Sequence, residues 1–509
     1  MMLLNTFARN GTRKRCGAGY LGVLLTFGLS GCVVGPNFDP PAPPSTTRYV
    51  SPDETKAGEG SAPLAAPPQD IELGEKVAID WWTLFQSPDL DLLVKQAVAG
   101  SLTLESAKAR LAQAREAIDV ASSALYPQIG LSAGAAREKV SATEFGLGPN
   151  AFPLPENFNL IQMGTSANYA LDIFGGTRRG IEQRSALADF QRDQLDAAYL
   201  ALTGDTVTET IQVAAARAQL KAVGDILDID RQNLDLVRKE RRAGTVPDSD
   251  VVIAESQLSQ DETLEPGLDQ QLSAAKHALA VLLGRAPGEW LAPDFEFASL
   301  TLPSQLPISL PSELVHQRPD IRAAEAQLHA ASAEIGIATA QLYPSVTLSA
   351  GVTTSALGGG NLFNPAGLVW SIAAGLTQPI FDGGMRRAER RAALAAFKAS
   401  AADYQQTVLL AFGQIADTLQ ALQNDAHLLA AQQHALDMAS ESVRLQRISY
   451  TRGGTGLLNL LDAQRQYQQA RLGYVRAQAQ RYQDTIQLLV ATGGGRWDAA
   501  PLRSASIRK

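Results

Sequence analysis

The decapeptide LYPSVTLSAG at residues 342–351 repeats, with three substitutions, the decapeptide LYPQIGLSAG at residues 125–134. After each Tyr-Pro, apolar residues alternate with small or polar ones, as at Val346, Leu348 and Ala350. A period of two is typical of a β-strand whose two faces meet different surroundings. The stretch therefore predicts a strand that the chain contains twice.

A second alternating stretch follows each of these strands. Loops rich in Gly, Pro and Asn, at residues 139–161 and 356–367, would connect the partners. Each strand has roughly ten to fourteen residues, enough to cross a bilayer as a tilted β-strand. In chain order the predicted strands cover about residues 126–138, 162–174, 343–355 and 367–381.

Two further motifs recur in the same order as the strands. Residues 173–176 (IFGG) are echoed by 380–384 (IFDGG), and residues 242–245 (RAGT) by 452–455 (RGGT). Such collinear self-similarity indicates a duplicated structural unit. The copies join through residues 284–319, whose six prolines exclude one long helix.

Proline-free segments rich in Ala, Leu, Gln, Arg and Glu follow each strand pair, at residues 177–243 and 385–452. Each predicts a helix roughly 100 Å long, at about 1.5 Å per residue. Apolar residues from Val408 to Val443 follow a 4-3 pattern, which is coiled-coil spacing. Shorter helices are expected at about residues 101–124, 248–283, 320–341 and 456–492. The repeats would then cover residues 81–283 and 320–495, followed by a C-terminal tail at 496–509.

The first 31 residues have the features of a secretory signal peptide. Four positive charges precede the apolar run Tyr20–Leu29, which is too short to span a bilayer as a helix. Residues 29–32 (LSGC) resemble the bacterial lipobox, whose cysteine becomes the first residue of the mature chain and is acylated. The alternative is an ordinary cleavage site with an incidental cysteine. We expect removal of residues 1–31, lipid on Cys32 and an extended tether over residues 32–80.

The mature chain then has no thiol for a disulfide or a metal, because Cys16 is removed and Cys32 carries lipid. Loss of four positive charges changes the net charge from -8 to -12, which disfavours nucleic acid as a partner. The hydrolase-like pattern GLSAG at residues 130–134 lies inside a predicted strand rather than at a strand-to-helix elbow. We expect neither enzymatic activity nor a cofactor or metal.

Four strands are too few to be stable in lipid, because open edges leave backbone groups unpaired in hydrocarbon. Two copies would give eight strands and a barrel filled by its own side chains, whereas three give twelve strands and an aqueous lumen. The small, polar residues on one face of the strands suit a water-filled interior and therefore favour three copies. The predicted fold class is an α+β membrane protein with four transmembrane strands per chain. These contribute to a trimeric twelve-stranded barrel, and the long coiled-coil helices form an α-barrel.

Motifs along nearly the whole mature chain resemble the TolC-like outer-membrane efflux proteins, specifically their lipoprotein branch. The similarity includes the tyrosine-proline strand starts in both repeats and four other stretches. These are Cys32 to Phe38, Trp81-Trp82 with Phe85 before Pro88-Asp89-Leu90, Arg318-Pro319-Asp320-Ile321, and Tyr450 through Arg465.

The resemblance implies a homotrimer in the bacterial outer membrane that extends into the periplasm. It also implies docking to a periplasmic adaptor and an inner-membrane pump, and passive conduction of drugs or other toxic compounds. The sequence names neither the cargo nor the pump. The alternative is a periplasmic coiled-coil lipoprotein with a bridging role, like an adaptor.

In that family the turn after each long helix forms a closed periplasmic tip. Glycines interrupt the helical runs at Gly244 and Gly453, so turns are expected there independently. The resemblance makes six residues gate candidates: Tyr450, Arg452, Asn459, Asp462, Asp250 and Asp248.

Three-fold symmetry would convert each acidic candidate into a carboxylate ring, which selects cations. The alternative is an ordinary role near a helix start, as a cap or a partner of the helix dipole. This alternative is strongest for Asp248. Two positions depart from the family pattern, because relatives can carry an arginine at Thr455 and an acid at Asn459.

Overall fold

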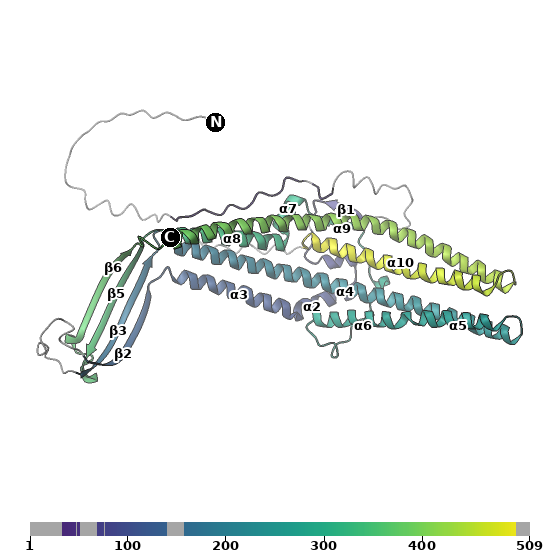
Figure 1. Cartoon of the computed structure of the whole chain (residues 1–509), viewed down its shortest axis with the longest axis horizontal. Coiled ribbons are helices and arrows are strands. Elements are labelled where there is room, and N and C mark those ends of the chain that lie inside the picture. The colour runs from purple at the N-terminus through teal and green to yellow at the C-terminus, as the bar shows by residue number, and fades with distance from the viewer. Residues whose placement is uncertain (1–32, 47, 51–68, 76, 140–156, 495–509) are drawn as a thin grey trace, which may run out of the picture. The chain divides into compact units, whose positions relative to one another are not determined.

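The computed structural model describes residues 33–46, 48–50, 69–75, 77–139 and 157–494 (Figure 1). The expected signal peptide, the acylated Cys32 and the tail from residue 496 lie outside these residues. The chain forms two compact units. Unit 1 comprises the described parts of residues 1–37, 119–182 and 332–394, and unit 2 the described parts of the rest.

Unit 1 contains a four-stranded antiparallel sheet in the order β2-β3-β5-β6. The two central strands come from different repeats and pair directly, with Ala167 opposite Ala350. The predicted four strands and the α+β class are therefore confirmed. The strands are β2 (Gln128–Lys139), β3 (Asn157–Leu171), β5 (Ser345–Ala356) and β6 (Leu368–Thr377).

The second strand of each pair ends earlier than predicted, three residues before position 174 and four before position 381. In the first repeat the Asp172 side chain accepts a hydrogen bond from the backbone N–H of Thr177, at 2.9 Å. Asp382 accepts from the backbone N–H of Gly384 in the same way, at 2.8 Å. Each carboxylate satisfies backbone donors at the start of the following long helix, so the chain leaves the sheet at that point.

The edge strands of the sheet, β2 and β6, are exposed at every position within the chain. The exposed side chains include large apolar ones, such as Leu131 (69%), Trp370 (70%) and Ile372 (78%). The sheet therefore has two open edges and an apolar surface that its own chain leaves uncovered.

The two long helices, α4 (Gly176–Arg242) and α9 (Met385–Thr451), have 67 residues each and agree with the prediction to within one residue at either end. The segment expected as one helix over 248–283 is interrupted at Thr263, because Pro266 has no N–H to continue the ladder. No helix of the described segments combines the length and apolar character needed to cross a membrane. The other helices are α2 (Pro88–Gly100), α3 (Leu102–Ser123), α5 (Asp248–Glu262), α6 (Leu264–Leu282), α7 (Pro311–Gln317), α8 (Pro319–Ala340) and α10 (Leu457–Ala491).

The main core of unit 2 gathers around aromatic side chains that precede α2. Trp81 and Phe85 are fully buried among residues of α2, α4, α6 and α10. The Phe85 ring lies 6.5 Å from Trp81 and 6.1 Å from Tyr482 of α10. The Trp82 indole N–H donates to Asp91 at 3.0 Å, so the aromatic pair both fills the core and fixes the start of α2.

Parts of the segment predicted as an extended tether are bound to the protein. In unit 1 the backbone N–H of Val34 donates to Phe174 at 3.1 Å, and the buried Arg179 guanidinium donates to Asn37 at 2.8 Å. In unit 2, strand β1 (Asp70–Leu73) pairs in parallel with β4 (Gln305–Ile308). Composition alone missed these contacts, because each depends on a partner at least 140 residues away in the chain.

We expect Phe85→Ala to lower the free energy of unfolding by about 3–5 kcal/mol, because it leaves a cavity between Trp81 and Tyr482. Denaturant midpoints measure the loss. Leu291→Ala is the control, because that side chain is 93% exposed and its loss should change stability by less than about 0.5 kcal/mol. Equal effects of the two substitutions would contradict the assignment of the core.

Candidate functional site

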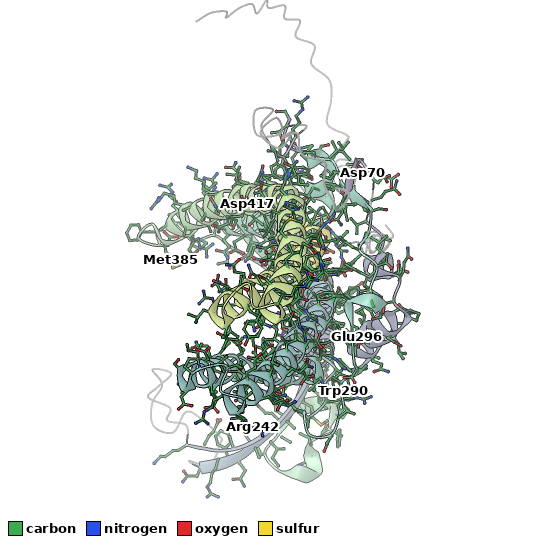
Figure 2. All side chains as sticks on the ribbon, turned by 90° about the vertical axis from the view of Figure 1, so that its right-hand side faces the viewer. Asp70, Arg242, Trp290, Glu296, Met385 and Asp417 are labelled. Atoms are coloured by element: carbon green, nitrogen blue, oxygen red, sulfur yellow. The ribbon has the colours of Figure 1, made fainter. Side chains whose placement is uncertain are left out.

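Two helical hairpins end in similar turns. Hairpin 1 is the unit 2 part of α4 with α5, and hairpin 2 is the unit 2 part of α9 with α10 (Figure 1). Gly244 and Gly453 adopt positive φ values of 76° and 72°, the left-handed conformation that ends a helix. In Figure 2 these turns face the reader, and Arg242 marks the end of α4. The turns lie where the glycines predict them.

An apolar cluster next to the turns joins all four helices. Its buried members are Val237 of α4 and Leu457 and Leu461 of α10. Residues from α5 and its preceding loop pack on them, together with Tyr450 of α9. The gate candidate Tyr450 therefore sits in a contact between the hairpins.

The Tyr450 hydroxyl donates a hydrogen bond to the Glu240 carboxylate across the two hairpins. Burial of the phenol, then the Glu240 and Asp250 charges, raise the pKa of Tyr450, so the donor stays protonated. Glu240 and Tyr450 are 210 residues apart, the same offset as between Arg242 and Arg452. They occupy equivalent positions in the two repeats and meet where the hairpins face each other.

The sequence interpretation missed Glu240. The signal was available, because adding the repeat offset to its number gives Tyr450. Glu240 is also the only acid in the basic run from residue 238 to 242.

Further polar contacts join α4 to α10 along their length. Asn233 donates to Gln464 at 2.8 Å, and Arg471 forms an ion pair with Asp225. The residue numbers of the contacting partners rise along α4 as they fall along α10, so the two helices run antiparallel. We call the set the cross-hairpin ladder; its rungs are Glu240–Tyr450, Asn233–Gln464, Asp225–Arg471, Gln219–Arg476 (3.3 Å) and, from α5 to α10, Asp261–Gln468 (2.9 Å).

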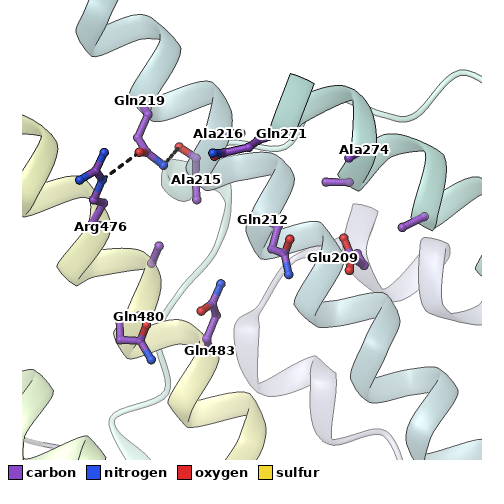
Figure 3. A pocket seen from close by; sticks show the side chains of 13 residues that line it. Glu209, Gln212, Ala215, Ala216, Gln219, Gln271, Ala274, Arg476, Gln480 and Gln483 are labelled. Atoms are coloured by element: carbon purple, nitrogen blue, oxygen red, sulfur yellow. Dashed lines mark hydrogen bonds between the residues drawn. The ribbon is translucent and has the colours of Figure 1, made fainter. Parts of the chain in front are cut away.

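At the rung farthest from the turns, α4, α6 and α10 enclose a groove of about 640 Å³. Glutamines project over a floor of alanines, and Gln219 accepts from Arg476 while donating to the carbonyl of Ala215 at 3.4 Å (Figure 3). The lining also includes the charged side chains of Glu209 and Arg476. In the part of the chain that the structure describes, no group of three or more His, Cys, Asp or Glu side chains is placed to hold a metal ion.

The two acidic candidates at the start of α5 have different surroundings. Asp248 forms an ion pair with Arg241 across the turn of hairpin 1. The N-cap position belongs to Pro247, and no side chain there accepts a backbone N–H. Asp250 lies in the first turn, and its charge acts on Tyr450. Asp250 thus acts on Tyr450 through its charge, while Asp248 braces the turn.

The remaining candidates are exposed on hairpin 2. Asp462 forms an ion pair with Arg465 and accepts from Gln466 at 2.8 Å, both on its own helix. It joins no two helices within the chain. The side chains of Arg452 and Asn459 have no ion pair or hydrogen bond with other described residues.

Two segments, residues 93–285 and 310–494, match a family model described as outer membrane efflux protein. The pyoverdine export outer membrane protein OpmQ of Pseudomonas aeruginosa is 32% identical over 440 residues, covering 85% of this chain and 92% of that protein. The toluene efflux pump outer membrane protein TtgF of Pseudomonas putida is 27% identical over 484 residues, covering 94% and 97%.

A similar fold occurs in the solved structure of the outer-membrane channel OprN. The two chains are 29% identical and superpose with a TM-score of 0.81. The match covers 91% of this chain and 99% of that one. The likeness therefore includes both the sheet and the hairpins.

We expect a double-mutant cycle of Tyr450→Phe and Glu240→Gln to show coupling of about 1.5 kcal/mol in unfolding free energy, because a hydrogen bond to a charged group contributes about 1.5–3 kcal/mol and this one is partly exposed. Denaturant unfolding of the four variants measures it. Additive effects would mean that the two side chains do not interact in solution.

Proposed function

The chain belongs to the outer membrane efflux protein family, and we propose that three copies assemble into the exit duct of a tripartite pump. The protein is an outer-membrane channel component of an efflux system. The duct is passive: it supplies a path, and the energy comes from an inner-membrane partner. No bound cofactor is needed for that task.

The open-edged sheet carries this proposal. Strands β2 and β6 are the edges of the sheet, and each leaves a row of backbone donors and acceptors unpaired within the chain. Hydrocarbon offers those groups no partners, so β6 of one copy must pair with β2 of the next until the ring closes. Three copies give about twelve strands and a lumen wide enough for water.

The proposed anchor is lipid on Cys32 after removal of residues 1–31. Acyl chains there would insert into the inner leaflet of the outer membrane, and together with the transmembrane strands they would anchor the protein. The binding of Val34 and Asn37 to unit 1 supports this, because it fixes the chain within a few residues of Cys32.

The proposed gate lies at the ends of the hairpins. The Tyr450–Glu240 hydrogen bond holds hairpin 2 against hairpin 1 inside one copy, and the Asp250 charge acts on Tyr450. Asp462, Asn459 and Arg452 project outward, where three-fold symmetry would bring them near other copies. Rings of the Asp462 carboxylate would then favour cations. Asp248 keeps the turn of hairpin 1 in shape through Arg241.

The cargo class is drugs or other toxic compounds, delivered through a periplasmic adaptor and an inner-membrane pump. Relatives whose names specify pyoverdine and toluene differ widely in the molecules exported. We therefore assign selectivity to the pump rather than to the duct.

In detergent the protein should run on an unheated gel at about three times the mass of the 54.1 kDa chain, and as a single chain after boiling, because the inter-copy strand ladder resists detergent. A charged substitution at the edge strand, Ile372→Asp, should weaken the trimer band. A monomer under both conditions would favour a periplasmic adaptor instead.

We expect Glu240→Ala to raise the open-to-closed ratio about tenfold for each copy in the trimer, because loss of the Tyr450 hydrogen bond removes about 1.4 kcal/mol per copy from the closed state. Single-channel conductance in planar bilayers measures it.

Glu441→Ala is the matched control, since that acid pairs only with Arg444 of its own helix. We also expect Asp462→Ala to raise the conductance of the trimer, because it removes the proposed ring of carboxylates from the closed gate. Unchanged conductance would remove the altered residue from the gate.

A further inference from the structure

We propose that Asp230 of α4 and Asp261 of α5 form a proton-binding site, in which one shared proton holds hairpin 1 in the shape that hairpin 2 docks on. The proposal deepens the gate described above and rests on it for its functional consequence. The site itself stands on the burial of both carboxyl groups and on the two Asp230 oxygens, which have no hydrogen-bond donor among the described residues.

Both carboxyl groups are buried: Asp230 is 2% exposed and Asp261 5%. Neither oxygen of Asp230 accepts a hydrogen bond from any donor in the described chain. Gln257 and Gln468 both donate to one oxygen of Asp261, at 2.8 and 2.9 Å. A buried carboxylate without donors is costly, and a proton between the two groups gives Asp230 its hydrogen bond.

The surrounding charges leave no cation for the pair. On α4 and α5, Arg231 pairs with Asp228 and Glu262. On α10, Arg471 pairs with Asp225, and on α9, Arg444 pairs with Glu441. Three further basic residues of these helices are also engaged: Arg465 with Asp462, Arg238 with Glu255 and Lys239 with Asp235. In the described chain no Lys, Arg or His forms an ion pair with either acid.

Burial first, then the hydrogen bond and charge of Asp261, raise the pKa of Asp230 to about 7. The folded pair therefore keeps a proton that an exposed aspartate releases near pH 4. This stabilisation is fully present below the unfolded pKa and is lost as the pH rises through the folded pKa. Asp230 thus titrates near neutral pH, where few side chains change charge.

The pair is coupled to the ladder through both of its helices. Asp261 accepts directly from Gln468, and Asn233, three residues after Asp230, donates to Gln464. A cavity of about 210 Å³ beside these rungs, bordered by Ile229, gives water room to enter. Loss of the shared proton leaves two like charges in contact. Their repulsion moves α5 away from α4 and loosens two adjacent rungs.

A second buried pair, Asp425 with Asp484, provides a matched comparison. Asp484 accepts from Gln480 at 3.0 Å, four residues earlier, as Asp261 does from Gln257. Burial and Asp484 raise the pKa of Asp425 to about 7, and Arg481 opposes the shift. This pair and Arg481 all lie within hairpin 2, so its titration does not act on a rung of the ladder.

The experiment measures conductance of the trimer in planar bilayers, with the pH on the hairpin side varied from about 6 to 8, one unit on either side of the Asp230 value. Wild-type conductance should rise with pH, by at most about tenfold per unit for one proton. Asn keeps a hydrogen-bond donor but does not titrate. The conductance of Asp230→Asn and of Asp261→Asn should therefore stay low and should not change with pH. Asp425→Asn should retain the wild-type response. A response unchanged in both Asp230→Asn and Asp261→Asn overturns the proposal.

Thermal unfolding separates the proton site from the gate. The wild-type midpoint should fall over the same pH range relative to that of Asp230→Asn, whether or not the hairpins gate the channel. If the midpoints of the wild type and Asp230→Asn change with pH in parallel, the proton site is overturned. If the midpoints diverge but the wild-type conductance does not change with pH, the coupling of the site to the gate is overturned. Trimer bands on unheated gels confirm that each variant assembles. A response that disappears when EDTA is added would assign the site to a divalent cation and overturn the shared proton.

Discussion

Unpaired backbone groups at the edges of one small sheet constrain this molecule more than any side chain does. Four antiparallel strands bury no core within the chain and leave β2 and β6 without neighbours. In water such edges invite aggregation, and in lipid each unpaired group costs several kcal/mol. Closing a ring of copies removes every edge at once. The apolar outer surface, exemplified by Trp370 and Ile372, then faces hydrocarbon instead of water.

The duplication of the chain determines how the hairpins meet in unit 2. Each repeat supplies one helical hairpin, and equivalent positions of the repeats meet, as Glu240 and Tyr450 do. The polar contacts between the hairpins are single hydrogen bonds and a partly exposed ion pair, and they lie among small apolar clusters. Such contacts contribute about 1 kcal/mol each. A ladder of a few weak rungs can open and close reversibly, which a fully packed core cannot do.

Buried carboxyl groups make the cross-hairpin ladder sensitive to pH. Asp230 and Asp261 sit where hairpin 1 meets α10, and Asp261 accepts hydrogen bonds from glutamines rather than pairing with a cation. A buried ion pair at the same place would hold across the whole physiological pH range. Two carboxyl groups instead make the contact depend on one proton. The comparable pair Asp425–Asp484 lies inside hairpin 2 with Arg481 nearby, so the same chemistry has a different consequence there.

The sequence by itself determined the four strands, both 67-residue helices and the glycine turns, because each depends on periodicity or on a residue's own backbone preference. It also placed Tyr450 near a turn, through family resemblance. Only the tertiary structure decided that Tyr450 meets Glu240, that Asp230 faces Asp261 and that residues near Val34 are bound. These contacts join residues up to 210 positions apart and depend on the rotation and register of packed helices. Local patterns fix which face of a helix is apolar, but not which side chain of another helix lies opposite it.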